Sequence, residues 1–358
     1  MNAFIAWTPL HLINIINTKV HYFDDELNDL YIYNEFKGAQ QLYDRAVDID
    51  IFDNVYLIKY NQMTKSYIKT ANLLFNLNGY NLSKDAYENI FVQGDNYFAK
   101  LFYAYVKSNN QQVKLHYIED GIGAYVESNI FDLKAKKNRL IKVINKNSIY
   151  RANFDKYFVY EPTLVQVDSR NKYLELPKLK VNTKAYNAII SLFEKTLNSL
   201  DRVKSVKYVF LDQPFQADGS EINEYKIFDI VQKAIKNQNE LAVKLHPRSD
   251  KRKYGKSRVI DTDLPWELYC LANKAENTTI ISMASSAAFT PSMMFDMKLP
   301  VIYLAEMIKN EFFSDQSDTA AVNTWLENAI NVGNVLNIRM PDEINIPKTI
   351  NDFHKFVD

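Results

Sequence analysis

The sequence of 358 residues has a single cysteine, Cys270, which excludes an intramolecular disulfide and any metal site built from clustered cysteines. An excess of one charge sign is also missing, because 43 lysine and arginine residues balance 43 aspartate and glutamate residues. No global field therefore attracts nucleic acid, and any anion site has to be assembled locally. We expect a cytoplasmic protein that does not bind nucleic acid.

Long hydrophobic runs are absent as well, and no apolar segment reaches the roughly 20 residues that a membrane-spanning helix needs. The N-terminal segment 1–17 is apolar, but it lacks a basic leader and a small-residue cleavage site. Thr8-Pro9 and His11 also interrupt it. The sequence predicts neither a secreted nor an integral membrane protein. Its hydrophobic share of 47% instead predicts a globular chain, and its length of 358 residues predicts about two domains.

Short apolar strands alternate with amphipathic helices in both halves of the sequence, a pattern that favours parallel α/β layers. An irregular segment, 167–182, separates the halves, so we expect α/β domains at 1–180 and 181–358. The expected strands are Ala3–Trp7, Leu30–Tyr33, Asn54–Ile58 and the segments 89–94, 113–121, 157–162, 206–214, 241–247 and 299–305. The expected helices are Leu10–Asn17, 67–78, 96–108, Ala185–Leu197, 222–238 and 265–275, and a strand followed by a helix is expected over 278–295.

The first polar motif at a strand end is "YIEDGIGAY", in which Glu119 and Asp120 precede Gly121. Ligands of parallel α/β sheets bind beyond the carboxyl ends of strands, where a carboxylate is placed to act as a general base. Glycine in this position lets the backbone approach a ligand closely. An ordinary Asp-Gly turn and a divalent cation site are alternative interpretations.

The second motif is "KLHPR", which places His246, Pro247 and Arg248 at the end of an apolar strand. The imidazole can donate a hydrogen bond or a proton to a phosphate oxygen, and the arginine adds positive charge. Proline fixes the turn between them. The alternative is a structural histidine beside a strand that ends at proline.

The third motif is "SMASSAAFTPSMM", in which Ser285 and Ser286 stand where a strand gives way to a helix. Their hydroxyls and the free backbone N–H groups of the helix form a phosphate cradle or, alternatively, an ordinary N-cap. A GxGxxG fingerprint, a Walker loop and a convincing DxD metal motif are absent. This absence argues against dinucleotide oxidoreduction and P-loop phosphoryl transfer.

In this order the three motifs resemble those of bacterial sialyltransferases, which use CMP-sialic acid and adopt the GT-B fold. "TPLH" at 8–11 and "FLDQPF" at 210–215 are most similar to glycosyltransferase family 52, the branch that sialylates lipooligosaccharide and capsular polysaccharide. The resemblance implies two Rossmann-like domains with the active site in the cleft between them. It assigns the acceptor and the base to the N-terminal domain and CMP-sialic acid to the C-terminal one.

The resemblance also implies roles for individual residues. Asp120 is the candidate base, with Asp212 as its first rival and Asp218 as a further one. His246 assists the departure of CMP, and Ser285 and Ser286 bind its phosphate. The remaining candidate substrate-binding residues are Thr8, Glu119, Gly121, Gln213, Pro247 and Arg248.

The resulting hypothesis is an inverting sialyltransferase that moves sialic acid from CMP-sialic acid to a galactose-terminated glycan of the bacterial surface. A monophosphate leaving group needs no metal ion, so we expect no metal and no cofactor besides the donor. The alternatives are an epimerase or hydrolase acting on a nucleotide sugar, and a non-catalytic protein that binds nucleotide or carbohydrate.

The basic segment Lys134–Arg151 has two interpretations. One is a solvated helix face, and the other is adhesion to an anionic membrane surface, here the inner face of the cell membrane. A homodimer is also compatible with the sequence.

Overall fold

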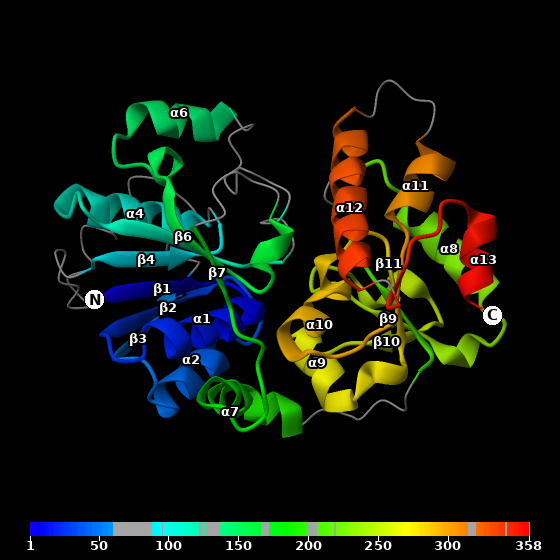
Figure 1. Cartoon of the computed structure of the whole chain (residues 1–358), viewed down its shortest axis with the longest axis horizontal. Coiled ribbons are helices and arrows are strands. Elements are labelled where there is room, and N and C mark those ends of the chain that lie inside the picture. The colour runs from blue at the N-terminus through cyan, green and yellow to red at the C-terminus, as the bar shows by residue number, and fades with distance from the viewer. Residues whose placement is uncertain are drawn as a thin grey trace. The chain divides into compact units, whose positions relative to one another are not determined.

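The computed structural model describes residues 1–59, 87–94, 96–121, 125, 136–165, 172–198, 206–217, 220–313, 320–340 and 342–357. The chain divides into two compact units, Met1–Asn198 (unit 1) and Ser199–Asp358 (unit 2) (Figure 1). The boundary therefore lies after helix α7 (Lys184–Asn198) and not at residue 180, because α7 packs on two helices of unit 1. The helix expected over 67–78 lies outside the described residues.

Unit 1 contains a sheet of parallel strands in the order β3-β2-β1-β4-β5-β6-β7. Its strands are β1 (Asn2–Ala6), β2 (Asn28–Asn34), β3 (Asn54–Lys59), β4 (Asn89–Val92), β5 (Lys114–Ile118), β6 (Phe154–Val159) and β7 (Tyr173–Glu175). Its helices are α1 (Pro9–Tyr22), α2 (Ala39–Asp48), α4 (Tyr97–Asn109), α6 (Lys136–Ile144) and α7, with short 3-10 turns η3 (Ile149–Arg151) and η4 (Pro162–Leu164).

Unit 2 contains a second parallel sheet, in the order β10-β9-β8-β11-β12-β13. Its strands are β8 (Tyr208–Leu211), β9 (Leu241–Lys244), β10 (Arg258–Ile260), β11 (Thr279–Ser282), β12 (Val301–Tyr303) and β13 (Ile344–Asn345). Its helices are α8 (Glu224–Ala234), α9 (Trp266–Asn273), α10 (Thr290–Phe295), α11 (Ala305–Phe312), α12 (Ala320–Arg339) and α13 (Ile350–Phe356). Its 3-10 turns are η6 (Gln238–Glu240), η7 (Lys251–Tyr254), η8 (Ala275–Asn277) and η9 (Ser286–Ala288).

Both sheets have the strand order of a Rossmann fold. When the strands of unit 2 are numbered within that unit, its order is 3-2-1-4-5-6, which is also the order of the first six strands of unit 1. The central strands are short and mostly apolar because both faces of such a sheet are covered, and β1 is buried along its whole length. β3 and β7, at the two edges of the unit 1 sheet, are only partly buried. The predicted α/β class is confirmed for both units.

Aromatic side chains fill both layers of the unit 1 core. Phe4 of β1 stacks on Phe91 of β4, with ring centroids 4.3 Å apart. Tyr31 of β2 packs instead against Phe98 and Phe102 of α4. Figure 1 shows α1, α2 and α7 together at one side of the sheet and α4 at the other. Among the helices of the described residues, none combines the length and the apolar character needed to cross a membrane.

Candidate active site

The predicted motifs lie at the carboxyl ends of strands in both units. In unit 2, "LDQP", "KLHPR" and the serine motif follow β8, β9 and β11, which are neighbours in the order β9-β8-β11. In unit 1, "TPLH" follows β1 and Glu119-Asp120 follows β5, with β4 between the two strands. The order of each sheet reverses beside β1 or β8, and ligands of open α/β sheets bind at such switch points.

The "TPLH" turn is built as a helix cap. Thr8 is the N-cap of α1, and its hydroxyl oxygen accepts a hydrogen bond from the His11 N–H at 3.3 Å. Proline at the next position fits the first helical turn because it has no N–H that needs a partner. Thr8 therefore orders the helix start, and the His11 side chain, which is 0% exposed, is held beneath it.

His11 contacts the candidate base. Its Nδ1 accepts a hydrogen bond from the Trp7 N–H at 3.3 Å, which leaves the proton of the neutral ring on Nε2. This Nε2 lies 3.1 Å from Oδ1 of Asp120. The N–H bond is not aligned with that oxygen as a hydrogen bond requires, so the contact is electrostatic in this conformation. Asp120 itself is 41% exposed.

Glu119 points the opposite way, into the interior of unit 1. The residue is 1% exposed, and its Oε2 accepts hydrogen bonds from the Tyr125 hydroxyl and, at 2.8 Å, from the Tyr160 N–H. Burial, helped by the negative charges of Glu161 and Asp120, raises the pKa of this carboxyl to about 8. Glu119 thus ties the end of β5 to the segment after β6, so the structure does not present it to a substrate.

The backbone that carries Asp120 is fixed on both sides. The Asn14 amide of α1 donates to the Glu119 carbonyl at 2.8 Å, and the Asp120 N–H donates to the Tyr117 hydroxyl at 3.2 Å. Gly121 follows with φ of 77°, in the left-handed region where a residue with a Cβ would be strained. These contacts leave the Asp120 carboxylate as the exposed acid of the motif.

Asp212 lies in a different environment at the end of β8. Its side chain is 0% exposed, and its Oδ1 contacts Nζ of Lys253 at 2.7 Å and accepts a hydrogen bond from the Tyr254 hydroxyl. The Lys253 ammonium also lies 3.1 Å from Oε1 of Glu224. Although burial opposes the charged form, these donors hold the pKa of Asp212 below its usual value. Asp212 is therefore an enclosed carboxylate at the centre of an ion-pair cluster.

His246 is positioned by this cluster and by its own turn. Its backbone N–H donates to Oδ2 of Asp212 at 3.1 Å. Its Nδ1 accepts a hydrogen bond from the Arg248 N–H at 3.2 Å, so the neutral ring carries its proton on Nε2. The side chain is half-buried, while Pro247 and Arg248 are exposed. The geometry thus supplies a ring N–H with a fixed tautomer at the strand end.

The serine motif lies at the same carboxyl-terminal end of the unit 2 sheet. Oε1 of Gln213 accepts a hydrogen bond from the Ala284 N–H at 2.8 Å, which ties the β8 turn to the loop after β11. The Ser285 N–H donates to the Ser282 hydroxyl at 2.9 Å, and the Ser285 hydroxyl accepts from the Ala287 N–H at 3.3 Å. Ser285 is therefore an N-cap of η9, and Ser286 follows it at a half-buried position.

A pocket of about 470 Å³ opens beside β8 and β9. Its charged lining residues are Arg248, Arg252, Lys253, Glu224 and Asp250, and two of the cations are paired with these acids, Arg252 with Asp250 and Lys253 with Glu224. Its other lining residues are Pro214, Gln216, Ala217, Tyr225 and Ser249. The volume falls in the range of small-ligand sites.

Two residues of the candidate site were not predicted from the sequence. One is His11, which contacts Asp120. The sequence feature that could have indicated it is the position of this histidine in "TPLH", three residues after a threonine that caps the helix. Lys253 belongs to the basic run after Arg248, which has the composition of a solvated surface, but its side chain is only 6% exposed. Spacing alone does not distinguish Lys253 from its exposed neighbours.

Among the described residues, the histidines, cysteines, aspartates and glutamates form no group of three or more that could hold a metal ion. Asp218, the further rival base, lies outside the described residues.

Comparison with known proteins identifies the family and the fold. The model of the alpha-2,8-polysialyltransferase family matches residues 15–303. An alpha/beta-galactoside alpha-2,3-sialyltransferase from the luminous marine bacterium Photobacterium phosphoreum superposes with a TM-score of 0.52 at 12% identity, covering 98% of each chain. A UDP-GlcNAc 2-epimerase from Neisseria meningitidis superposes with a TM-score of 0.47 at 12% identity, covering 100% of this chain and 98% of the other. No curated protein sequence matches. The first superposition confirms the predicted GT-B type of α/β fold.

Proposed function

As a member of the alpha-2,8-polysialyltransferase family, the chain is a glycosyltransferase of sialyl groups, and we propose that it takes them from CMP-sialic acid with inversion. The acceptor hydroxyl attacks the anomeric carbon and gives its proton to a base, while the bond from that carbon to the CMP phosphate breaks. In this proposal unit 1 binds the acceptor and unit 2 binds the donor.

The contrast between the two aspartates carries the assignment of the base. Asp120 is 41% exposed and its side chain contacts Nε2 of His11 at 3.1 Å, so its carboxylate can approach an acceptor hydroxyl. Asp212 is 0% exposed and surrounded by donors that would have to be displaced first. The geometry therefore favours Asp120 as the base and gives Asp212 the task of holding the donor loop.

The leaving group is assigned to unit 2. His246 has a ring proton on Nε2 to donate to a phosphate oxygen, and the motif of Ser285 and Ser286 lies across β8 from it. The CMP phosphate gains charge as its bond to the sugar breaks, and these donors stabilise that charge in the transition state. A monophosphate can leave on such donors alone, which is why we propose transfer without a metal ion.

The acceptor is proposed in two forms. The motif resemblance to glycosyltransferase family 52 favours a galactose-terminated glycan of the bacterial surface, as expected from the sequence. The family match favours a sialic acid terminus instead, because the family is described as one of alpha-2,8-polysialyltransferases. Both acceptors offer a hydroxyl that needs a base, so the role of Asp120 is the same.

The test is an assay of purified protein with CMP-sialic acid and a panel of lactose, a sialyllactose and no acceptor. Transfer to one of the sugars with an inverted linkage is expected, and most activity should survive EDTA. Release of free sialic acid at the same rate without acceptor would favour a hydrolase. Binding of CMP without turnover on any acceptor would favour a non-catalytic protein, and restoration of EDTA-treated enzyme by Mg²⁺ or Mn²⁺ alone would overturn metal-independent transfer.

The variant His246→Ala tests the leaving-group assignment. Since the ring acts mainly in the transition state, kcat should fall by about 10²–10⁴-fold while KM changes less. Wild-type kcat in the folded variant would show that the histidine is structural.

A further inference from the structure

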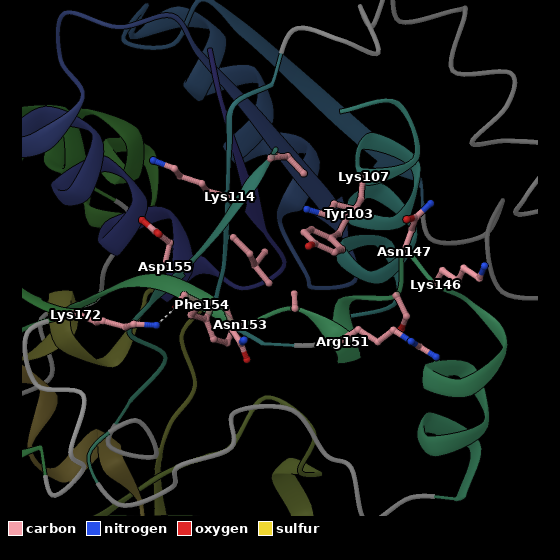
Figure 2. Close-up of a pocket in the computed structure, with 14 residues that line it drawn as sticks. Tyr103, Lys107, Lys114, Lys146, Asn147, Arg151, Asn153, Phe154, Asp155 and Lys172 are labelled. Carbon is pink, nitrogen blue, oxygen red and sulfur yellow. Dashed lines mark hydrogen bonds between the residues drawn. The ribbon is translucent and has the colours of Figure 1, made fainter. Parts of the chain in front are cut away.

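A second pocket, with a volume of about 350 Å³, lies in unit 1 at the end of the sheet where β5 and β6 begin. Figure 2 shows its side chains arriving from α4, from the start of β5, from the turn after α6 and from the start of β6. The lining residues are Tyr103, Lys107, Val113, Lys114, Leu115, Lys146, Asn147, Ser148, Arg151, Ala152, Asn153, Phe154, Asp155 and Lys172. None of them belongs to the candidate active site.

The charge of this pocket is strongly positive. Its basic residues, here called the basic rim, are Lys107, Lys114, Lys146, Arg151 and Lys172, whereas Asp155 is the one acidic residue among those lining it. Within the described part of the chain, Lys114 and Lys146 are exposed and make no ion pair. Lys107, Arg151 and Lys172 donate hydrogen bonds to backbone carbonyls, which are neutral and leave their positive charges uncompensated. Like charges gathered without a paired carboxylate repel one another, so the rim favours an anionic ligand.

Exposed aliphatic side chains lie next to the basic rim. Val143 and Ile144, at the end of α6, are 70% and 73% exposed. The Arg151 guanidinium donates hydrogen bonds to the carbonyls of Lys142 and, at 3.1 Å, Val143. The end of α6 is therefore fastened to the rim, and the cations and the aliphatic side chains form one surface.

We propose that this surface docks on a membrane of anionic phospholipids. Val143 and Ile144 enter the boundary between headgroups and acyl chains, while the basic rim binds lipid phosphates. A soluble anionic glycan would satisfy the charges, but it would leave the two aliphatic side chains in water. The combination of both features therefore favours the membrane, and the inference does not depend on the proposed sialyl transfer.

The docking surface and the candidate base lie at opposite ends of strand β5. Lys114 is the first residue of β5, and Asp120 follows the last one. A strand of this length spans roughly 17 Å. Contact of the basic rim with a membrane therefore leaves the other end of the strand, where Asp120 lies, open to substrate.

Sedimentation with lipid vesicles tests the proposal. The full chain should bind vesicles of phosphatidylcholine with 30% phosphatidylglycerol, should not bind pure phosphatidylcholine, and should release in high salt because the attraction is screened. Lys114→Gln with Lys146→Gln should weaken binding about 25-fold, at about fivefold for each cation. Val143→Ser with Ile144→Ser should weaken it about tenfold or more, and turnover of a soluble acceptor should stay unchanged in both variants.

Matched changes in unit 2 provide the controls. Lys256→Gln with Lys298→Gln removes the same charge from exposed positions, and Ile338→Ser removes an aliphatic side chain that is 84% exposed. Neither should change vesicle binding. The proposal would be overturned if the control variants lost as much vesicle binding as the test variants, or if the wild type did not bind. It would also be overturned if Val143→Ser with Ile144→Ser left binding unchanged. It would also be wrong if soluble polysialic acid displaced the vesicles through Lys114 and Lys146, because the rim would then be a glycan site.

Discussion

Asp120 and Asp212 both follow a buried parallel strand, yet their surroundings differ in every respect that matters for chemistry. Asp120 is exposed and contacts one imidazole edge. Asp212 is enclosed by Lys253, Tyr254 and the backbone of His246. An aspartate at a strand end is thus accessible to a substrate when water reaches it, and it is a structural anchor when cations and hydroxyls surround it. Changes at and around the two sites can break or sharpen this comparison.

The largest effect is expected for Asp120→Asn. An amide cannot take the proton of the acceptor hydroxyl, so kcat should fall by about 10²–10⁴-fold. The melting temperature should change little because the side chain is exposed. Steady-state kinetics and thermal denaturation on the same preparation measure both. A folded variant with near wild-type kcat would remove Asp120 from the mechanism.

The reverse profile is expected for Asp212→Ala. The change leaves Lys253 with Glu224 as its remaining carboxylate. It also removes the acceptor of the Tyr254 hydroxyl and the His246 N–H, so the free energy of unfolding should fall by about 3–5 kcal/mol. The kcat of the folded fraction should fall less than in Asp120→Asn, since the loop that carries His246 loosens but the base stays. Chemical denaturation and active-site-normalised kinetics measure the two quantities. A stable variant that is as inactive as Asp120→Asn would make Asp212 the base.

A smaller effect on stability is expected for Glu119→Gln, and it depends on pH. The folded-state pKa of Glu119 is raised to about 8, so its contribution to stability is present at low pH and is lost as pH rises toward 8. Glutamine does not titrate and keeps an acceptor for the Tyr160 N–H. The melting temperature of the wild type should therefore fall relative to that of the variant between pH 5 and about 8. Parallel curves for the two proteins would contradict the buried titration.

The smallest effect is expected for His11→Phe. The ring positions the Asp120 carboxylate through the contact of its Nε2 with Oδ1. Without that contact kcat should fall about tenfold, while KM for both substrates is unchanged. His11→Gln should recover much of this loss because its amide N–H can reach the carboxylate. A purely structural histidine would show the same loss in both variants, together with a lower melting temperature.

The sequence predicted the parts of this protein that local patterns determine. Alternating apolar strands and amphipathic helices revealed the α/β class, and the polar residues directly after Ile118, Leu211 and Leu245 were correctly placed at or near strand ends. The boundary between the units was misplaced because α7 is amphipathic on its own, and only its packing on α1 and α2 assigns it to unit 1.

The burial of the acids could not be predicted, since it depends on residues distant in sequence. Asp212 is enclosed by Lys253 and Tyr254, which lie about forty positions further along, and Glu119 by the backbone of Tyr160. The contact of His11 with Asp120 joins two segments more than a hundred residues apart. In each case the residue type suggested chemistry, and the tertiary neighbours decided whether it is accessible.

The anchoring of His246 has a thermodynamic consequence for donor binding. Oδ2 of Asp212 accepts a hydrogen bond from the backbone N–H of His246, and Oε1 of Gln213 accepts one from that of Ala284, so both loops are fixed by contacts within unit 2 itself. The conformational entropy that a disordered phosphate loop would lose on binding was therefore already lost when unit 2 folded. In the proposed mechanism, the CMP phosphate therefore binds at this end of the sheet without that entropic cost, and more of its contact energy remains as affinity.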